Sequence, residues 1–338
     1  MSNTENTNTT ANEYKTRLVM VNDTYLGMIE NQMSGHNIEL AEYGKTCVIN
    51  ALSSINELLT SNGLAFGDPV LDTGTLTTAL LTVATLQLNA KAANKEVYFQ
   101  LRNKKVSEGG KEVWKKQLEM GIEGDGWDSL ISRFGRDVKK VYPYWCVRSG
   151  DKYTPPRHRG IDLIAPEWEE TGMGEVVRVV YPILHNDNTV HYYTCEKDEV
   201  LKNLYAHITN NLMNETFGLS KKRQEATPDE LKEIAAKKKA ILNKAQSLGW
   251  GALDDEEITP YISPSWTEYH SRESMIIRKM RNRICKAIPK DFGSAYTSDV
   301  YNRASDESYA DEIGKIDIPS TAYLNEGTGE VATGTPNF

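Results

Sequence analysis

The sequence predicts an α+β fold in which a small antiparallel or mixed sheet packs against helices. Two observations predict this class: apolar residues recur at helical spacing in several stretches, and short β-rich runs occur in pairs around turns. Along the chain the order is helices, a hairpin, a helix, a strand, a second hairpin and further helices. With 338 residues, 39% of them hydrophobic, the chain has enough apolar material for a core.

The first elements are two helices and a hairpin. Apolar residues have helical spacing over 48–59, and again over 75–88 after the break at Gly67-Asp68-Pro69. Residues 96–101 and 113–120 are β-rich, and the segment between them is basic and contains glycine. We therefore expect a hairpin whose turn, at 102–111, is cationic.

A helix, a strand and a second hairpin come next. Residues 126–134 have helical spacing with Trp127 on the apolar face, and Gly135 is expected to end that helix. Residues 140–148 are expected to form a strand. Residues 174–184 and 189–195 are expected to form a hairpin through a turn at 185–188.

The remaining folded part is predicted to be helical. Residues 198–212 are one helix candidate. Thr227, Pro228 and Glu230 provide a cap, an early proline and an early acid for a second helix that ends near Leu248. Residues 266–288 are predicted to form the last helix, with apolar residues on one face and most of its basic residues on the others.

Composition predicts the domain boundaries. Residues 1–13 are expected to be a disordered arm, and residues 14–300 a single core domain that includes a helical insertion at 214–258. Residues 301–338 are expected to be an acidic flexible tail and a candidate segment for binding a partner. From residue 304 onward this tail contains seven acidic residues and one lysine.

Several classes of protein are excluded by what the sequence lacks. No run approaches the roughly 20 apolar residues of a membrane helix, and no secretory signal opens the chain, so we expect a cytoplasmic protein. Gly44-Lys45-Thr46 resembles the end of a phosphate loop, but Glu39 stands where the first glycine is needed. The cysteines are too far apart for a typical zinc site and are expected to be reduced thiols: Cys47, Cys146, Cys195 and Cys285.

No catalytic constellation is predicted. The letters of a magnesium-dependent nuclease occur at 228–232, but a helix start explains them better. His185 and His191 flank a turn without a third metal ligand nearby. One acidic cluster has no nucleophile or base at matching spacing and is expected at the surface: Glu119, Glu123, Asp125 and Asp128. We therefore expect a binding protein rather than an enzyme, without a metal site.

Basic and aromatic residues favour binding to single-stranded nucleic acid, which requires cations along the phosphates and flat side chains against bases. The formal net charge is -8, but residues 266–290 contain seven basic and two acidic residues. The candidate DNA-binding residues form three groups. They are Arg102, Lys104, Lys105, Lys111, Lys115 and Lys116; Trp127, Arg133, Arg136, Lys139 and Lys140; and Arg278, Lys279, Arg281, Arg283 and Lys286. A hydrophobic-core role for Trp127, and a solvated surface for each basic group, are the alternatives.

Six short motifs in a fixed order resemble the phage RecT/Redβ family of single-strand annealing proteins. They are Ala84-Thr85-Leu86-Gln87-Leu88-Asn89, Lys95-Glu96-Val97-Tyr98, the basic hairpin at 102–116, Asp125-Gly126-Trp127 with Gly135, the strand pair at 176–195, and Trp266 with Met275, Lys279, Arg281 and Arg283. The similarity covers residues 45–300. It departs from the family at Ala90, where a proline is usual, at Gln100-Leu101, and at the insertion.

The resemblance implies ATP-independent annealing of complementary DNA strands in bacteriophage recombination, inside a bacterial host. It also implies rings or helical filaments on DNA, a partner 5′→3′ exonuclease and a host single-strand binding protein. No cofactor is expected, with Mg²⁺ at most a modulator of annealing. A passive single-strand protector and a metal-dependent DNA-processing enzyme are the alternative functions. We further expect Arg278, Lys279, Arg281 and Arg283 to line one groove with Lys104, Lys105, Lys115 and Lys116.

Overall fold

The computed structural model describes residues 17–305, which fold into two compact units. Unit 1 contains the described residues up to Gly126 and those from Phe292 onward, and unit 2 is Trp127–Asp291. The α+β class is confirmed. The two units divide the core predicted over 14–300, because the chain leaves unit 1 at Gly126 and returns to it at Phe292. The arm expected at 1–13 and most of the acidic tail lie outside the described residues.

Unit 1 contains four helices among the described residues. The two predicted ones are α2 (Glu42–Ser61) and α3 (Thr73–Leu86); α1 (Arg17–Gly35) and α9 (Ala295–Ser305) were not predicted. Helix α3 is buried on almost every side, and the Asp72 side chain caps it by accepting a hydrogen bond from the Gly74 N–H. Gly44–Thr46 lie inside α2, so they form no phosphate loop. Tyr301 in α9 is buried, so the fold extends past the predicted boundary at residue 300.

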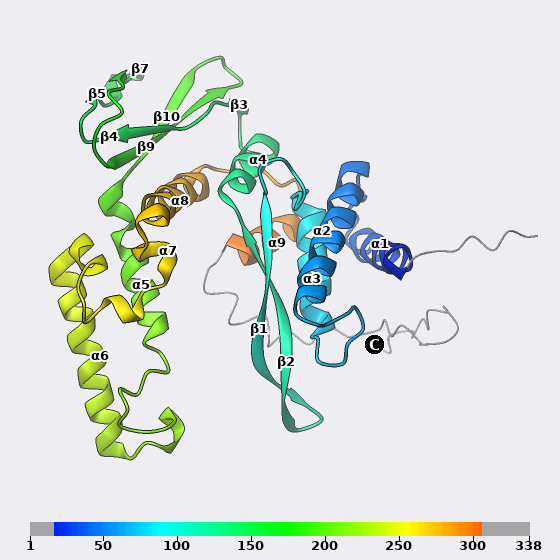
Figure 1. The fold of residues 1–338 in the computed structure, drawn as a ribbon. Helices are drawn as coiled ribbons and strands as arrows, with labels where there is room; N and C mark the ends of the chain where they lie inside the picture. The colour runs from blue at the N-terminus through cyan, green and yellow to red at the C-terminus, as the bar shows by residue number, and fades with distance from the viewer. Residues whose placement is uncertain (1–16, 306–338) are drawn as a thin grey trace, which may run out of the picture. The chain divides into compact units, whose positions relative to one another are not determined.

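The first hairpin is longer than its sequence pattern indicated. Strands β1 (Val97–Glu108) and β2 (Lys111–Ile122) pair along their whole length and are joined by Gly109 and Gly110 alone. Both glycines have positive φ, +57° and +79°, as the tightest hairpin turns require. The segment 102–111, predicted to be the turn, is therefore mainly strand. Its outer half projects beyond the helices of unit 1 (Figure 1).

A four-stranded antiparallel sheet forms the centre of unit 2. The central strand β9 (Val176–His185) pairs with β10 (Val190–Glu196) on one side, and with β3 (Val138–Val141) and β4 (Trp145–Arg148) on the other. The hairpin predicted at 174–195 is confirmed. The strand predicted at 140–148 is broken into β3 and β4 around Pro143, because proline cannot donate a hydrogen bond within a sheet.

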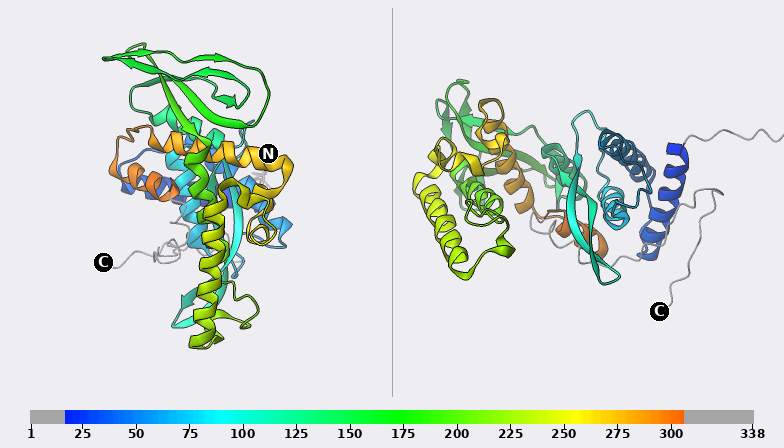
Figure 2. Two further views of the ribbon diagram at one scale, coloured as in Figure 1. Left: turned by 90° about the vertical axis from the view of Figure 1, so that its left-hand side faces the viewer. Right: turned by 60° about the horizontal axis from the view of Figure 1, so that its bottom comes forward.

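One helix of unit 2 packs against this sheet, and others precede or follow its strands. Helix α4 (Gly124–Phe134) precedes β3, and α8 (Tyr269–Ala287) packs against β9 and β10 (Figure 2). The predicted last helix is interrupted at Glu268, where an extended backbone separates α8 from the short α7 (Pro264–Thr267). The 3₁₀ turn η1 (Lys197–Val200) leads into α5 (Leu201–Asn211), which lies beside α6 (Pro228–Leu248).

The longest element of the insertion at 214–258 is α6. Its predicted start is confirmed, because the Thr227 hydroxyl accepts from the Glu230 N–H while the Glu230 carboxylate accepts from the Thr227 N–H. Short 3₁₀ turns flank it: η2 (Arg223–Glu225), η3 (Gly249–Leu253) and η4 (Thr259–Tyr261).

Gly135 is needed for close packing rather than for a left-handed helix end. A Cβ at this position would lie 2.4 Å from the Ile131 carbonyl oxygen and 2.6 Å from a Val138 methyl group. The left-handed residue after α4 is Asp137, with φ of +58°. The helix end predicted at Gly135 is confirmed.

His207 makes the stability of unit 2 depend on pH. Its Nε2 accepts a hydrogen bond from the Ser263 N–H at 3.0 Å, and burial, with a smaller effect of Lys279, holds its pKa below the ordinary 6.5. The unfolded chain therefore takes up a proton at a higher pH than the folded chain. We expect the free energy of unfolding to fall as the pH drops through about 6.5, measured by urea unfolding. His207→Gln should flatten this dependence, whereas His158→Gln, at an exposed position, should leave it unchanged. Equal slopes for all three proteins would contradict the assignment.

Candidate nucleic-acid interface

The outer half of the first hairpin, residues 102–116, is a cationic ribbon. It contains six basic residues and only two acidic ones, Glu108 and Glu112. Lys104 lies directly opposite Lys115 in the register, and like charges in such cross-strand pairs are normally destabilising. Lys111 and Lys116 have no ion-pair partner among the residues described. Because basic residues outnumber acidic ones on the ribbon, it has the electrostatic character of a phosphate-binding surface.

Ion pairs neutralise part of the ribbon. Lys105 contacts Glu112 at 2.7 Å, and Arg102 contacts Glu119 at 3.0 Å. Lys115 contacts Glu108 at 2.9 Å and also donates to the Pro69 carbonyl oxygen. The Lys105 pair is largely exposed and contributes little to stability. In the other pair Arg102 is exposed while Glu119 is mostly buried, so both cations still reach solvent and can contact a phosphate.

The base of the ribbon is fixed to the start of α3. The Lys116 N–H donates to the Val70 carbonyl at 2.7 Å, and the Asp72 N–H donates to the Lys116 carbonyl at 2.9 Å. The Gln117 side chain donates to the Asp72 carboxylate, and the Leu118 N–H donates to the Thr75 hydroxyl. These bonds hold the ribbon's cations on a rigid support.

Trp114 is an exposed aromatic residue that the sequence analysis did not select. It is 62% exposed, it lies opposite Lys105 in the register, and the Lys105 ammonium is 5.7 Å from the ring centroid. An exposed indole beside lysines can stack on a base of a single strand. The sequence contained one signal, because Trp114 is surrounded by charged residues that a core strand would not contain: Lys111, Glu112, Lys115 and Lys116.

We expect Trp114→Ala to weaken binding to single-stranded DNA by about 1 to 3 kcal/mol, the usual contribution of one stacked base. Val113→Ala, at the neighbouring exposed position, is the matched control and should bind as the wild type does. Fluorescence anisotropy of a labelled oligonucleotide measures both. Equal losses in the two variants would show that Trp114 does not stack.

Trp127 is a core residue, not a stacking platform. It is 3% exposed, and the Lys286 ammonium lies 5.5 Å from its ring centroid. The DNA-binding role assigned to Trp127 is therefore corrected, and its alternative core role is confirmed. Its position on the apolar face of α4 was the correct indication.

Arg281 is also structural. Arg281 is 8% exposed. Its Nη2 contacts the Asp128 carboxylate at 2.8 Å, and its Nε donates to the Tyr181 hydroxyl at 2.7 Å. The Tyr181 hydroxyl in turn donates to Asp128 at 2.7 Å. The carboxylate partner comes from α4, so Asp128, which was expected at the surface, is a partly buried member of this ion pair. This correction removes Arg281 from the candidate DNA-binding residues.

The other basic residues of α8, and those at the end of α4 and after it, stay at the surface or half-buried. Arg283 is paired with Glu199 at 2.7 Å, and Arg136 binds Asp291 through two nitrogens. Lys139 donates to the Asn188 side chain, and Lys140 lies 4.8 Å from the Tyr142 ring centroid. The half-buried or exposed remainder is Arg133, Arg278, Lys279 and Lys286.

The structure brings two of the predicted groups together within unit 2: the group at 127–140 and the group on α8 at 278–286. The Arg136 N–H donates to the Pro289 carbonyl, and the Asp291 N–H donates to the Phe134 carbonyl, so the end of α4 adjoins the segment after α8. The cationic ribbon belongs to unit 1. The single groove expected to contain both lysine-rich and arginine-rich groups therefore stays a prediction.

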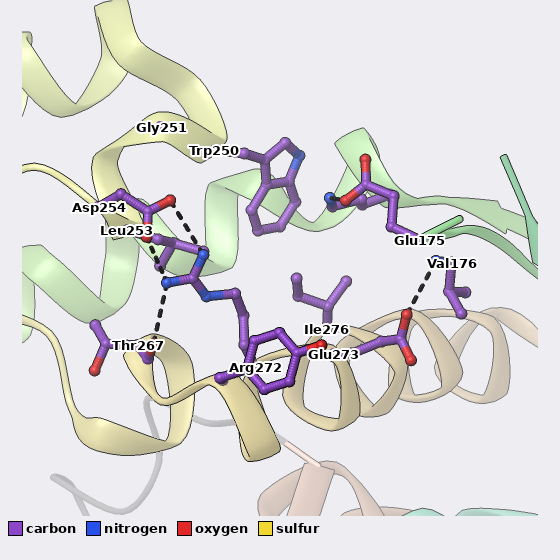
Figure 3. Close-up of a pocket in the computed structure, with 12 residues that line it drawn as sticks. Glu175, Val176, Trp250, Gly251, Leu253, Asp254, Thr267, Arg272, Glu273 and Ile276 are labelled. Carbon is purple, nitrogen blue, oxygen red and sulfur yellow. Dashed lines mark hydrogen bonds and ion pairs between the residues drawn. The ribbon is translucent and has the colours of Figure 1, made fainter. Parts of the chain in front are cut away.

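A cavity of about 680 Å³ in unit 2 has charges that are already compensated. Arg272 binds Asp254 through two nitrogens, Lys197 pairs with Glu175, and Glu273 accepts from the Val176 N–H (Figure 3). Glu273 also pairs with Arg148 outside the cavity lining. Trp250 and Leu253, which follow α6, form part of the wall, so the insertion helps to build this cavity. Because its cations are engaged, the cavity is a weaker candidate for phosphate than the ribbon.

His185 and His191 meet across the second hairpin, as their positions suggested, with ring centroids 4.3 Å apart. Over residues 17–305, no group of three or more metal-ligating side chains is found. No helix in that range is long and apolar enough to cross a membrane.

The comparisons with known proteins found no match: the sequence fits no family model, and it matches no curated protein and no solved structure.

Proposed function

We propose that this protein binds single-stranded DNA through the cationic ribbon and pairs complementary strands without hydrolysing a nucleotide. The observation that carries the proposal is the ribbon itself, a rigidly anchored hairpin with six basic residues, two acidic residues and an exposed tryptophan. The six motifs that resemble the RecT/Redβ family support the same function and extend the proposal to membership of that family, with its single-strand annealing core.

Annealing needs no reactive group. Two DNA strands repel each other through their phosphates, and cations that neutralise one strand lower the cost of bringing up its complement. An aromatic contact can hold a base while its hydrogen-bonding edge remains accessible to the partner strand. The ribbon has both components, and its contacts are to phosphates and ring faces, so the proposed binding does not depend on DNA sequence.

The remaining parts of the proposal rest on the resemblance alone. They are assembly into rings or filaments, cooperation with a 5′→3′ exonuclease and a host single-strand binding protein, and action in phage recombination within a bacterial cytoplasm. The acidic tail, most of which lies outside the described residues, is proposed as the partner-binding segment. A truncation that tests it should begin after Ser305, since ending the chain at Tyr301 would cut α9.

One gel experiment separates the proposal from its alternatives. Two complementary oligonucleotides are incubated with and without protein, with Mg²⁺ or with a chelator. The proposal predicts faster duplex formation in both conditions. A passive protector would bind the first strand and slow its pairing, and a metal-dependent enzyme would shorten the DNA only when Mg²⁺ is present.

A further inference from the structure

Residues 150–174 form a projecting arm that the sequence analysis did not predict. The arm contains two short antiparallel ladders, β5 (Lys152–Thr154) with β8 (Glu167–Glu169) and β6 (Arg157–Arg159) with β7 (Asp162–Ile164). The outer ladder buries almost nothing, because five of its six residues are exposed. It therefore contributes little to the core of unit 2. The side chains that it exposes to solvent are the feature that needs an explanation.

The base of the arm is firmly held. The Asp151 carboxylate accepts hydrogen bonds from the Arg148 N–H, the Thr171 N–H and hydroxyl, and the Trp168 indole N–H. These donors hold the pKa of Asp151 far below its usual range. Trp168 also stacks on Trp145 of β4, with ring centroids 5.3 Å apart. These contacts attach the base of the arm firmly to the sheet.

The tip of the arm combines cations with an apolar residue. Arg157 and Arg159 alternate along β6, so they share one face, and their exposed side chains have no hydrogen-bond or ion-pair partner in the described part of the chain. Gly160, with φ of +68°, makes the turn, and Ile161 follows it with 100% of its surface exposed. An isoleucine in the turn that directly follows the strand with the two arginines fits a partner that is anionic and has apolar surface beside its charges.

DNA has both features, phosphates on the outside and stacked bases between them. Apolar side chains of DNA-binding proteins insert between base steps and unstack them, while neighbouring arginines hold the phosphates. We propose that the arm tip is a second DNA contact, in which Arg157 and Arg159 bind phosphates and Ile161 wedges against a base step. This inference rests on the proposed DNA-binding function and adds a contact to the bases of the paired strands.

The test uses the full-length protein and a pair of complementary oligonucleotides, one carrying 2-aminopurine, whose fluorescence rises when the base is unstacked. We expect the wild type to increase the fluorescence of the annealed duplex, and Ile161→Ala to lose about half of that increase or more, with little change in affinity. Met173→Ala is the matched control, since Met173 is 71% exposed at the base of the same arm. It should behave as the wild type does. Because Ile161 and Met173 are exposed, neither change should alter the thermal midpoint.

The arginines give a second readout. Arg157→Gln with Arg159→Gln should lower the slope of log affinity against log salt by about 1.4 on a single strand, as expected for two lost phosphate contacts. The inference is overturned if the wild type anneals DNA while the Ile161 variant gives the full fluorescence increase. It is also overturned if the tip variants change only the sedimentation of the protein, which would make the tip a contact between protein chains. Wild-type protein that unstacks the duplex but does not accelerate pairing would instead contradict the proposed annealing function.

Discussion

Replacing Arg281 by alanine should lower the free energy of unfolding by about 3 kcal/mol, the usual cost of leaving one member of a buried ion pair alone. The guanidinium is 10% exposed and neutralises Asp128, which is only 29% exposed, while it also donates to the Tyr181 hydroxyl. Without it, the Asp128 carboxylate loses this cation while it stays hydrogen-bonded to the Tyr181 hydroxyl. Urea unfolding measured by circular dichroism gives the change directly.

Arg283→Ala is the matched control for this variant. It lies two residues further along α8, and its partner Glu199 is 38% exposed, so its loss should cost less than about 1 kcal/mol. Asp128→Asn combined with Arg281→Gln should be less destabilising than the sum of the two single changes, because the pair is coupled. If Arg281→Ala instead leaves stability unchanged and abolishes DNA binding, the structural role assigned to Arg281 is wrong.

Replacing Lys104, Lys105 and Lys116 together by glutamine should weaken binding to single-stranded DNA by about 100-fold, at about 1 kcal/mol for each contact. The slope of log affinity against log salt should fall by about 2, since each phosphate contact contributes roughly 0.7. All three lysines lie in the ribbon, and Lys105 and Lys116 are on its tryptophan-bearing face. Titrations at several salt concentrations measure both quantities.

The control removes the same number of charges elsewhere. Lys232, Lys237 and Lys239 lie on α6, and the pairs of Lys232 with Asp229 and of Lys237 with Glu233 are exposed. Glutamine at these positions should leave the affinity and its salt dependence nearly unchanged. Equal losses of affinity in the two triple variants would mean that DNA binding depends on the net charge of the protein and not on the ribbon.

Local patterns predicted the elements better than they predicted the boundaries between them. The helices α2, α3 and α6 and the second hairpin follow from spacing and caps, which are short-range signals. The hairpin turn was misplaced because the run of cations at 102–111 resembled a loop. The turn consists of Gly109 and Gly110 alone, which both adopt the positive φ that it requires. The division into two units depends on the return of the chain at Phe292, which no local pattern contains.

The residues of the candidate site could likewise be predicted only where neighbouring residues in the sequence carry the signal. Cationic residues on the ribbon could be found from the sequence because their neighbours are also polar and exposed. Arg281 was misassigned because its partner Asp128 is far away in the sequence, so a local count of acids on α8 could not reveal the pair. Arg157 and Arg159 were missed because they occur in short strands between prolines, which carry little periodicity.

The pairing rate of two complementary oligonucleotides, labelled as a fluorescence donor and acceptor, tests the central claim most directly. The reaction is followed at low salt with a chelator and without nucleotide, for the wild type, the ribbon triple variant and the α6 triple variant. We predict acceleration by the wild type and by the α6 variant, with most of it lost in the ribbon variant. Pairing at the spontaneous rate with wild-type protein, or acceleration only when ATP is supplied, would contradict the account.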